Sequence, residues 1–145
     1  GANLERAYLK GANLKGANLD GANLDFHQLS DYQKSIFNIC PTGQFEGYKK
    51  IIYDKGDLII KIIIPAEAKR FNALSSRKCR AEYAIFDSIV EGEQYVKVGY
   101  SKHNSSFQYI LEKGTKIIPD SFDERNIECS HGVHFFLTLE EAKDY

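Results

Sequence analysis

The densest cluster of chemically reactive side chains lies at residues 129–134, which read Cys-Ser-His-Gly-Val-His. The candidate catalytic residues are Cys129, His131 and His134. In an extended segment, residues two apart point to the same side, so the Cys129 thiol could act as a nucleophile with His131 as its base. The alternative is a cysteine that packs as a small hydrophobe and histidines that form ordinary hydrogen bonds. No oxyanion site is apparent in the sequence.

A zinc site is the second chemistry that this segment could support. Two thiolates and two imidazoles are a ligand set that structural zinc takes. The set available here is Cys79, Cys129, His131 and His134. The paired Cys-x-x-Cys spacing of zinc fingers and ribbons is missing, and His134 faces away from its neighbour in a strand. We therefore expect no metal and no cofactor.

Positive charges form another candidate site. Residues 78–85 alternate between charged and apolar side chains, which predicts one long strand with a basic face. A guanidinium can bind phosphate or carboxylate with two hydrogen bonds, so the predicted partner is a small anionic ligand or a protein. The alternative is a solvated face paired with Glu67 and Glu82. The candidate ligand-binding residues are Lys49, Arg77, Arg80 and His134.

The elements that would position these residues are mostly antiparallel strands. Residues 48–53 and 58–64 predict a hairpin whose second strand is apolar on both faces and therefore central. Residues 107–111 and 115–118 predict another hairpin. Residues 133–137 predict a strand before a helix, with Thr138 as its N-cap and Glu141 completing a capping box. These elements predict a compact α+β domain, mainly antiparallel, over residues 40–145.

Residues 1–29 repeat every five residues, a period that neither a helix nor a strand has. The repeat resembles the pentapeptide-repeat family, in which a small residue and Asn or Asp precede a central Leu, as in residues 12–14. This resemblance implies a right-handed quadrilateral β-helix, a β-solenoid with four pentads to a coil. Gly1 is already in register, so we expect further repeats upstream, and His27 is too large for the interior, so we expect the coil to end there. The expected solenoid core is Leu4, Leu9, Leu14, Leu19, Leu24 and Leu29.

The repeat segment is too short to be stable alone. Its leucines make roughly one and a half coils, whereas about three units are needed for a stable stack. An open coil end also exposes unpaired backbone groups. We therefore expect residues 30–39 to be a connector and residues 40–145 to cap the coil, burying Leu24 and Leu29. The predicted function is a non-catalytic structural or binding module that presents its basic face to a partner.

The second region also carries a resemblance. Its blocks are similar to an uncharacterised domain that occurs behind pentapeptide repeats in large DNA viruses, phages and bacteria. The resemblance implies no activity. The blocks are residues 40–50, 64–70, 76–84, 122–125 and 128–136.

A shorter segment is similar to ADP-ribosyltransferases. Residues 132–135 (Gly-Val-His-Phe), then Thr138, Ala142 and Tyr145, resemble a Gly-Ile-Tyr-Phe, Ser, Ala, Tyr segment that helps to bind NAD in those enzymes. The chain lacks their upstream His-Gly-Thr strand and a catalytic Glu after the segment. A nucleotide-binding or ADP-ribosyltransferase-like enzyme therefore stays as the alternative function.

Composition narrows the class of protein. The net charge of −1 argues against nucleic acid as a partner and against the acidic surface of a DNA mimic. Three cysteines, an odd number, do not predict a disulfide framework and favour a reducing, cytoplasmic location, which is the host cytoplasm if the protein is viral. No apolar run approaches the length of a transmembrane helix, so we expect no membrane partner.

Overall fold

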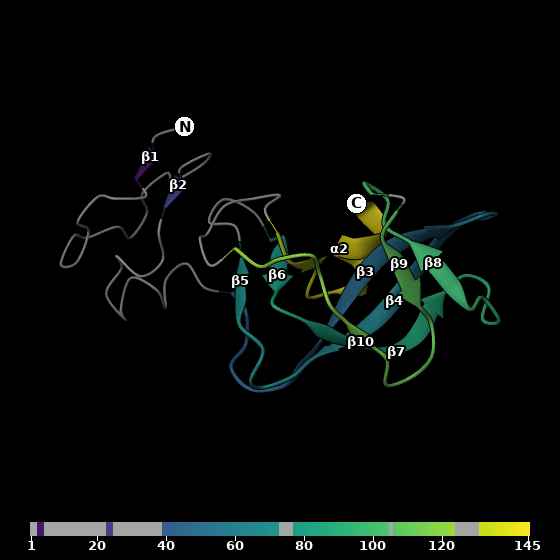
Figure 1. The fold of residues 1–145 in the computed structure, drawn as a ribbon, viewed down its shortest axis with the longest axis horizontal. Helices are drawn as coiled ribbons and strands as arrows, with labels where there is room; N and C mark the ends of the chain where they lie inside the picture. The colour runs from purple at the N-terminus through teal and green to yellow at the C-terminus, as the bar shows by residue number, and fades with distance from the viewer. Residues whose placement is uncertain (1–2, 5–22, 25–38, 73–76, 105, 124–130) are drawn as a thin grey trace.

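The computed structural model describes residues 3–4, 23–24, 39–72, 77–104, 106–123 and 131–145, and most of their regular structure is antiparallel sheet (Figure 1). The larger sheet contains β3 (Phe45–Tyr53), β4 (Gly56–Ile64), β7 (Ala84–Glu91), β8 (Val98–Tyr100), β9 (Gln108–Ile110) and β10 (Lys116–Ile117). Its strand order is β10-β7-β4-β3-β8-β9. The smaller sheet, in the order β11-β6-β5, contains β5 (Arg70–Asn72), β6 (Cys79–Ala81) and β11 (Val133–Phe135).

The first predicted hairpin is present as β3 and β4. The two strands pair from Tyr53 opposite Gly56 to Phe45 opposite Ile64. β4 lies between β3 and β7, so it is central, as its apolar sequence predicts. Ile60, Ile62 and Ile64 are fully buried and form the middle of the hydrophobic core.

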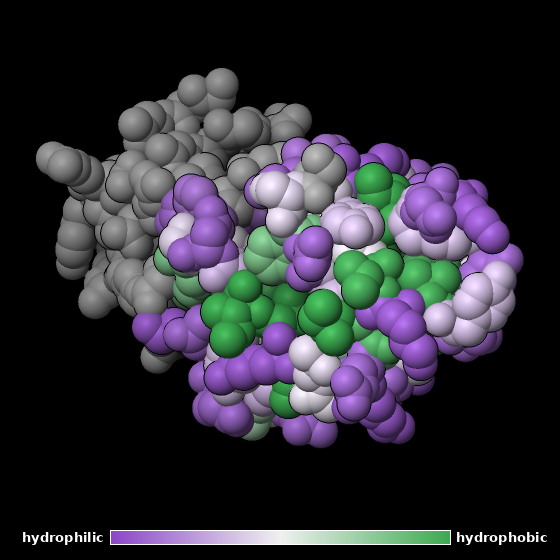
Figure 2. Space-filling view, turned by 45° about the vertical axis from the view of Figure 1, so that its right-hand side comes forward, coloured by the Kyte–Doolittle hydropathy of each residue, from purple (hydrophilic) through white to green (hydrophobic). Residues whose placement is uncertain are grey.

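The second predicted hairpin is wrong. β9 pairs with β8, whereas β10 pairs with β7 at the other end of the sheet. The turn at Gly114 hydrogen-bonds to β7 instead, because the Gly114 N–H donates to the Phe86 carbonyl oxygen at 2.9 Å. The sheet is curved, so its two edge strands, β9 and β10, line one gap. The exposed side chains of Ile110 and Ile118 lie beside this gap. Figure 2 shows hydrophobic residues gathered across one face of the domain, with hydrophilic residues around them.

The long strand predicted at residues 78–85 is also wrong. The chain leaves the smaller sheet after β6 and enters the larger sheet at β7, and the Glu82 N–H donates to the Lys69 carbonyl oxygen at 2.8 Å between them. Lys78 and Arg80 are buried, so these residues do not form the solvated basic face that the alternation predicts. The reason is that β6 is the central strand of its sheet, between β5 and β11.

One edge of β3 is shared by two strands. Near one end, Ile52 pairs with Tyr100 of β8. Near the other end, Tyr48 and Phe136 exchange two backbone hydrogen bonds of 2.8 Å, which join the smaller sheet to the larger one. Gly47 permits this junction, because a Cβ there would lie 2.5 Å from the Phe135 ring. β8 and β11 therefore separate along the middle of β3.

The predicted helix is present as α2 (Leu139–Asp144). The Thr138 hydroxyl accepts a hydrogen bond from the Glu141 N–H at 3.2 Å and donates to the Glu141 carboxylate at 2.8 Å, so the expected cap is confirmed. Among the described residues, no helix is long and apolar enough to cross a membrane.

Two short strands are described in the repeat segment. β1 (Asn3–Leu4) pairs in parallel with β2 (Asn23–Leu24), with Leu4 opposite Leu24. The offset of twenty residues equals four pentads, which is the offset that the expected coil requires. The remaining expected core leucines lie outside the described residues.

Arg70 connects the start of the domain to its smaller sheet through hydrogen bonds. Its guanidinium donates hydrogen bonds of 2.6–3.2 Å to five backbone carbonyl oxygens and lies 5.2 Å from the centroid of the Phe45 ring. A planar fork with five N–H groups can satisfy all of these acceptors, which an ammonium cannot. The carbonyls belong to Pro41, Gly43, Pro65, Ala66 and Ala68.

We expect Arg70→Lys to lower the free energy of unfolding by about 2–3 kcal/mol, because several carbonyls lose their donor. Arg77→Lys is the matched control, since Arg77 is exposed and forms one ion pair with Glu141, worth less than about 1 kcal/mol. Urea unfolding followed by circular dichroism measures both. Equal losses in the two variants would contradict this role of Arg70.

Candidate functional site

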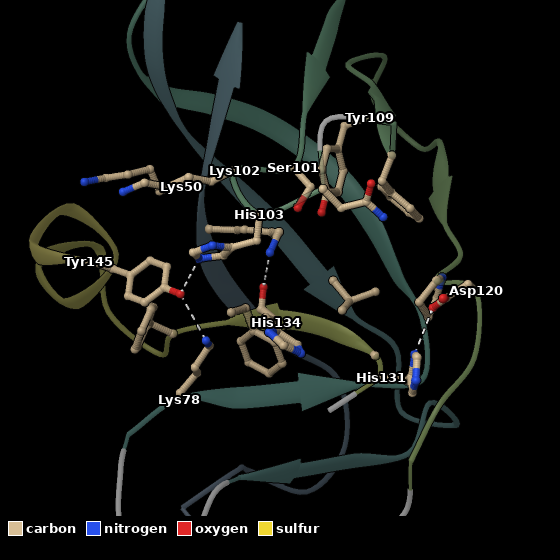
Figure 3. Close-up of a pocket in the computed structure, with 18 residues that line it drawn as sticks. Lys50, Lys78, Ser101, Lys102, His103, Tyr109, Asp120, His131, His134 and Tyr145 are labelled. Carbon is tan, nitrogen blue, oxygen red and sulfur yellow. Dashed lines mark hydrogen bonds and ion pairs between the residues drawn. The ribbon is translucent and has the colours of Figure 1, made fainter. Parts of the chain in front are cut away.

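A cleft of about 540 Å³ opens where β8 and β11 separate along β3 (Figure 3). Lys49 and Lys50 of β3 line it on one side. The other lining residues come from β9, from the segment after β8, from β11 and from the end of the chain at Tyr145. The volume is in the range of sites that enclose a small molecule. The shared edge of β3 thus creates this hollow of the domain.

The polar lining of this cleft is mostly cationic. Among the described lining residues, Asp120 has the only acidic side chain, whereas four are lysines and three are histidines. The chain as a whole has a net charge of −1, so this concentration is local. Such a lining attracts anions. The cationic and titratable residues are Lys49, Lys50, Lys78, Lys102, His103, His131 and His134.

Tyr145 organises one end of the cleft, where Figure 3 shows Lys78 and His103 pointing at its hydroxyl. The Lys78 ammonium donates to this hydroxyl at 3.1 Å, and His103 Nε2 lies 2.7 Å from it. Lys102 Nζ lies 5.6 Å from the centroid of the same ring, and the ring packs on Phe136. Two ammonium groups and an imidazole therefore meet around one phenol.

Lys49 holds a strongly perturbed ammonium in the cleft. Lys49 Nζ donates to the His134 carbonyl oxygen at 2.9 Å, the bond drawn at the centre of Figure 3, and lies 5.9 Å from the centroid of the Tyr109 ring. The residue is only half-buried, but burial of its ammonium, with repulsion from Lys78, lowers the pKa of Lys49 to about 8. Among the described residues, no carboxylate forms an ion pair with this group.

The loop after β8 carries two of the basic lining residues, Lys102 and His103. Asn104 orders it, because its side-chain oxygen accepts hydrogen bonds from the N–H of Ser106 at 3.2 Å and from the hydroxyl of Ser106 at 2.6 Å. The Phe107 N–H also donates to the Asn104 carbonyl oxygen at 3.0 Å. These bonds fix the turn on which Lys102 and His103 lie.

The other end of the cleft is held by Arg80. Its guanidinium donates to the carbonyl oxygens of Asp123 at 2.7 Å and His131 at 2.8 Å, and it lies 5.8 Å from the centroid of the Phe122 ring. The His131 imidazole lies 3.3 Å from the Asp120 carboxylate at this end. Arg80 therefore acts on the site by positioning the segments that carry Asp120 and His131.

Comparisons with known proteins identify the family to which this domain belongs. A model described as a family of unknown function, DUF5758, matches residues 36–142, and a model described as pentapeptide repeats (8 copies) matches residues 1–31. The chain belongs to the DUF5758 family. No curated protein and no solved structure matches it. The described lining of the cleft lies within the DUF5758 match except for Tyr145, which follows it.

The structure brings only some of the candidate residues together in the DUF5758 domain. Lys49, His131 and His134 line the cleft. Arg77 and Arg80 do not belong to its described lining: Arg77 pairs with Glu141 at 2.7 Å and holds the pKa of that carboxyl below its usual value, and Arg80 bonds to backbone carbonyls. Cys129 lies outside the described residues.

The weak zinc candidate is not assembled by the described residues. Cys79 pairs with Phe135 across β6 and β11, whereas His134 pairs with Arg80, so the thiol and the imidazole point to opposite faces of the sheet. Cys79 is fully buried in the core. Contact with the Cys40 thiol, together with burial, raises the pKa of the Cys79 thiol, which keeps it protonated and a poor ligand at neutral pH.

Sequence reasoning missed several residues of the cleft. Lys102, His103, Tyr109 and Tyr145 were not among the candidates, yet each lines it. The available signal was the polar run at residues 101–106 between two strands, because binding residues concentrate on such loops. The resemblance to ADP-ribosyltransferases includes Tyr145, but the sequence does not name it as a candidate binding residue.

Lys49→Met tests the electrostatics of the DUF5758 cleft. Between pH 8 and 10.5, the unfolded chain binds more protons at Lys49 than the folded chain does, so the stability of the wild type rises with pH relative to the variant. We expect this relative gain to be on the order of 2–3 kcal/mol from pH 7 to pH 10.5. Urea unfolding of both proteins at each pH measures it.

Lys50→Met is the matched control, because it removes the neighbouring lysine, whose ammonium bonds to the Lys143 carbonyl oxygen at 2.8 Å at an exposed position. A difference between wild type and Lys49→Met that stays constant with pH, or that Lys50→Met reproduces, would contradict the burial of a charged Lys49.

Proposed function

We propose that the DUF5758 domain of this chain is a binding module for a small anionic ligand that occupies the cleft. The observation that carries this proposal is the place of Lys49 in the cleft, where burial and the charge of Lys78 both disfavour its ammonium form. Among the described residues no carboxylate pairs with the Lys49 ammonium, and a buried cation in that situation lowers stability. An anion between Lys49 and Lys78 would remove that cost.

The chemistry of the lining supports a phosphorylated or carboxylated ligand. Lys78 is nearly buried, and its ammonium donates to the Tyr145 hydroxyl, whose ring also lies near Lys102. Ammonium groups bind phosphate as compact point charges, and each has three donors. Phe107 and Tyr109 add aromatic surface to the same cleft, which suits a ligand with an apolar or planar part.

A nucleotide is one such ligand, and a specific observation favours testing it. Residues 132–135 and Tyr145, which carry the resemblance to ADP-ribosyltransferases, all line the cleft. Thr138 and Ala142 of the same resemblance have structural roles, as the cap and the buried residue of α2. NAD is therefore included among the probes.

Binding is tested by thermal shift and calorimetry with phosphate, pyrophosphate and NAD at constant ionic strength. We expect pyrophosphate to raise the Tm, and Lys78→Met to weaken its binding about 10- to 100-fold, the equivalent of one charge-assisted hydrogen bond. Binding should also weaken from pH 7 to pH 9, because Lys49, with a pKa of about 8, loses its charge.

Arg77→Met is the matched control, since it also removes one positive charge but outside the described lining. If Arg77→Met and Lys78→Met weaken the binding of pyrophosphate equally, the anion responds only to the net charge of the protein and not to a site in the cleft. No stabilisation by any of the three probes would contradict the proposal.

We further propose that the DUF5758 domain caps a β-solenoid formed by the pentapeptide repeats. The parallel pairing of Leu4 with Leu24, one four-pentad offset apart, supports a coil of this geometry. A coil of this length needs a neighbour that covers its open end.

Removal of the domain tests the capping proposal. A chain that ends after residue 35 should aggregate, because the unpaired coil end is exposed, whereas residues 1–145 should remain monodisperse under the same conditions. Size-exclusion chromatography with light scattering measures both. A soluble monomer of the short chain with β-structure in circular dichroism would contradict capping.

A further inference from the structure

Lys49 differs from the other lysines of the cleft in what surrounds its nitrogen. Its described partners are the His134 carbonyl oxygen at 2.9 Å and the face of the Tyr109 ring. A carbonyl oxygen accepts a hydrogen bond from an ammonium and, more weakly, from a neutral amine, which still has two N–H donors. The nitrogen can therefore lose a proton and still donate this bond from its place in the lining of the cleft.

The environment also favours the neutral amine. Lys78 is the nearby cation that repels the charge of Lys49, and burial adds to this effect. A lysine that is desolvated beside another cationic group is the arrangement by which an amine becomes a nucleophile near neutral pH. Lys50, the next residue, has its ammonium bonded to the Lys143 carbonyl oxygen at an exposed position and lacks this enclosure.

We propose that Lys49 is a reactive amine that forms a reversible imine with an anionic aldehyde or ketone bound in the cleft. This inference rests on the proposed anion-binding function. The neutral Nζ attacks the carbonyl carbon, and a proton moves to the carbonyl oxygen to give a carbinolamine. The carbinolamine then loses one water molecule to form the C=N bond. Protonation of this nitrogen gives an iminium, and hydrolysis reverses the reaction.

The neighbouring groups suit such a ligand. Lys78 and Lys102 lie at the Tyr145 end of the cleft and would hold its phosphate or carboxylate. The His103 imidazole, 2.7 Å from the Tyr145 hydroxyl, can exchange a proton there. The ligand class is therefore a carbonyl compound with a separate anionic group, rather than an anion alone.

Reductive trapping on the full chain tests this inference. Pyridoxal 5′-phosphate, an aldehyde with a phosphate group, is added at equimolar concentration at pH 7.5 and reduced with borohydride, and the labelled peptides are identified by mass spectrometry. We expect Lys49 to carry at least tenfold more label than Lys50. We also expect excess pyrophosphate to reduce the label at Lys49 at least fivefold.

Two variants are matched to this experiment. Lys49→Arg keeps the positive charge but cannot form an imine, so it should bind pyrophosphate and lose the preferential label. Lys50→Arg should retain the label at Lys49. Label spread evenly over the lysines, or equal label at Lys49 and Lys50, would overturn the inference.

Acetaldehyde, which carries no charge, separates this inference from the proposed function. Preferential ethylation of Lys49 by acetaldehyde and borohydride supports the reactive amine, whatever the result with pyrophosphate. The absence of a thermal shift with pyrophosphate would refute only the anion-binding function. A pyrophosphate shift without preferential labelling of Lys49 by either aldehyde overturns the imine and leaves the anion-binding function standing.

Discussion

The division of one strand edge between two partners determines the rest of this structure. β3 pairs along its whole length with β4, but its other edge is occupied by β8 near Ile52 and by Phe136 near Tyr48. The two partners approach from different sheets, so they cannot meet side by side in the middle of the strand. Gly47 and Gly99 allow the close approach at each junction, since a Cβ at either would lie 2.5 Å from a packed side chain. The cleft, its cationic lining and the union of the sheets all follow from this split.

Local signals in the sequence predict the elements better than their assembly. The β3–β4 hairpin and the Thr138 cap depend on residues close together in the chain, and both are confirmed. The hairpin expected across Gly114 failed because that turn bonds to Phe86, far earlier in the chain. The alternation at residues 78–85 failed because it presumes that one face is solvated, whereas β6 is central and Lys78 is buried.

The same limit applies to the candidate site. The sequence indicates Lys49 by its charge and His134 by its place in the cluster at residues 129–134, and both line the cleft. Arg80 was chosen for the same reason, but a buried guanidinium that donates to two carbonyls positions a loop and is not part of the described lining. The meeting of Lys78 with Tyr145 joins residues 67 positions apart, and no local pattern predicts it.

The two proposals make opposite demands on Lys49, and the geometry reconciles them. An anion in the cleft favours the ammonium, because the charges attract, whereas attack on a carbonyl requires the neutral amine. With a pKa of about 8, Lys49 populates both forms near neutral pH. Once an iminium forms, its nitrogen is again positively charged. The anionic group of the ligand then has two cations near it, the iminium and Lys78. The repulsion between Lys49 and Lys78 is therefore what would make the amine reactive, and a bound anion is what would relieve it.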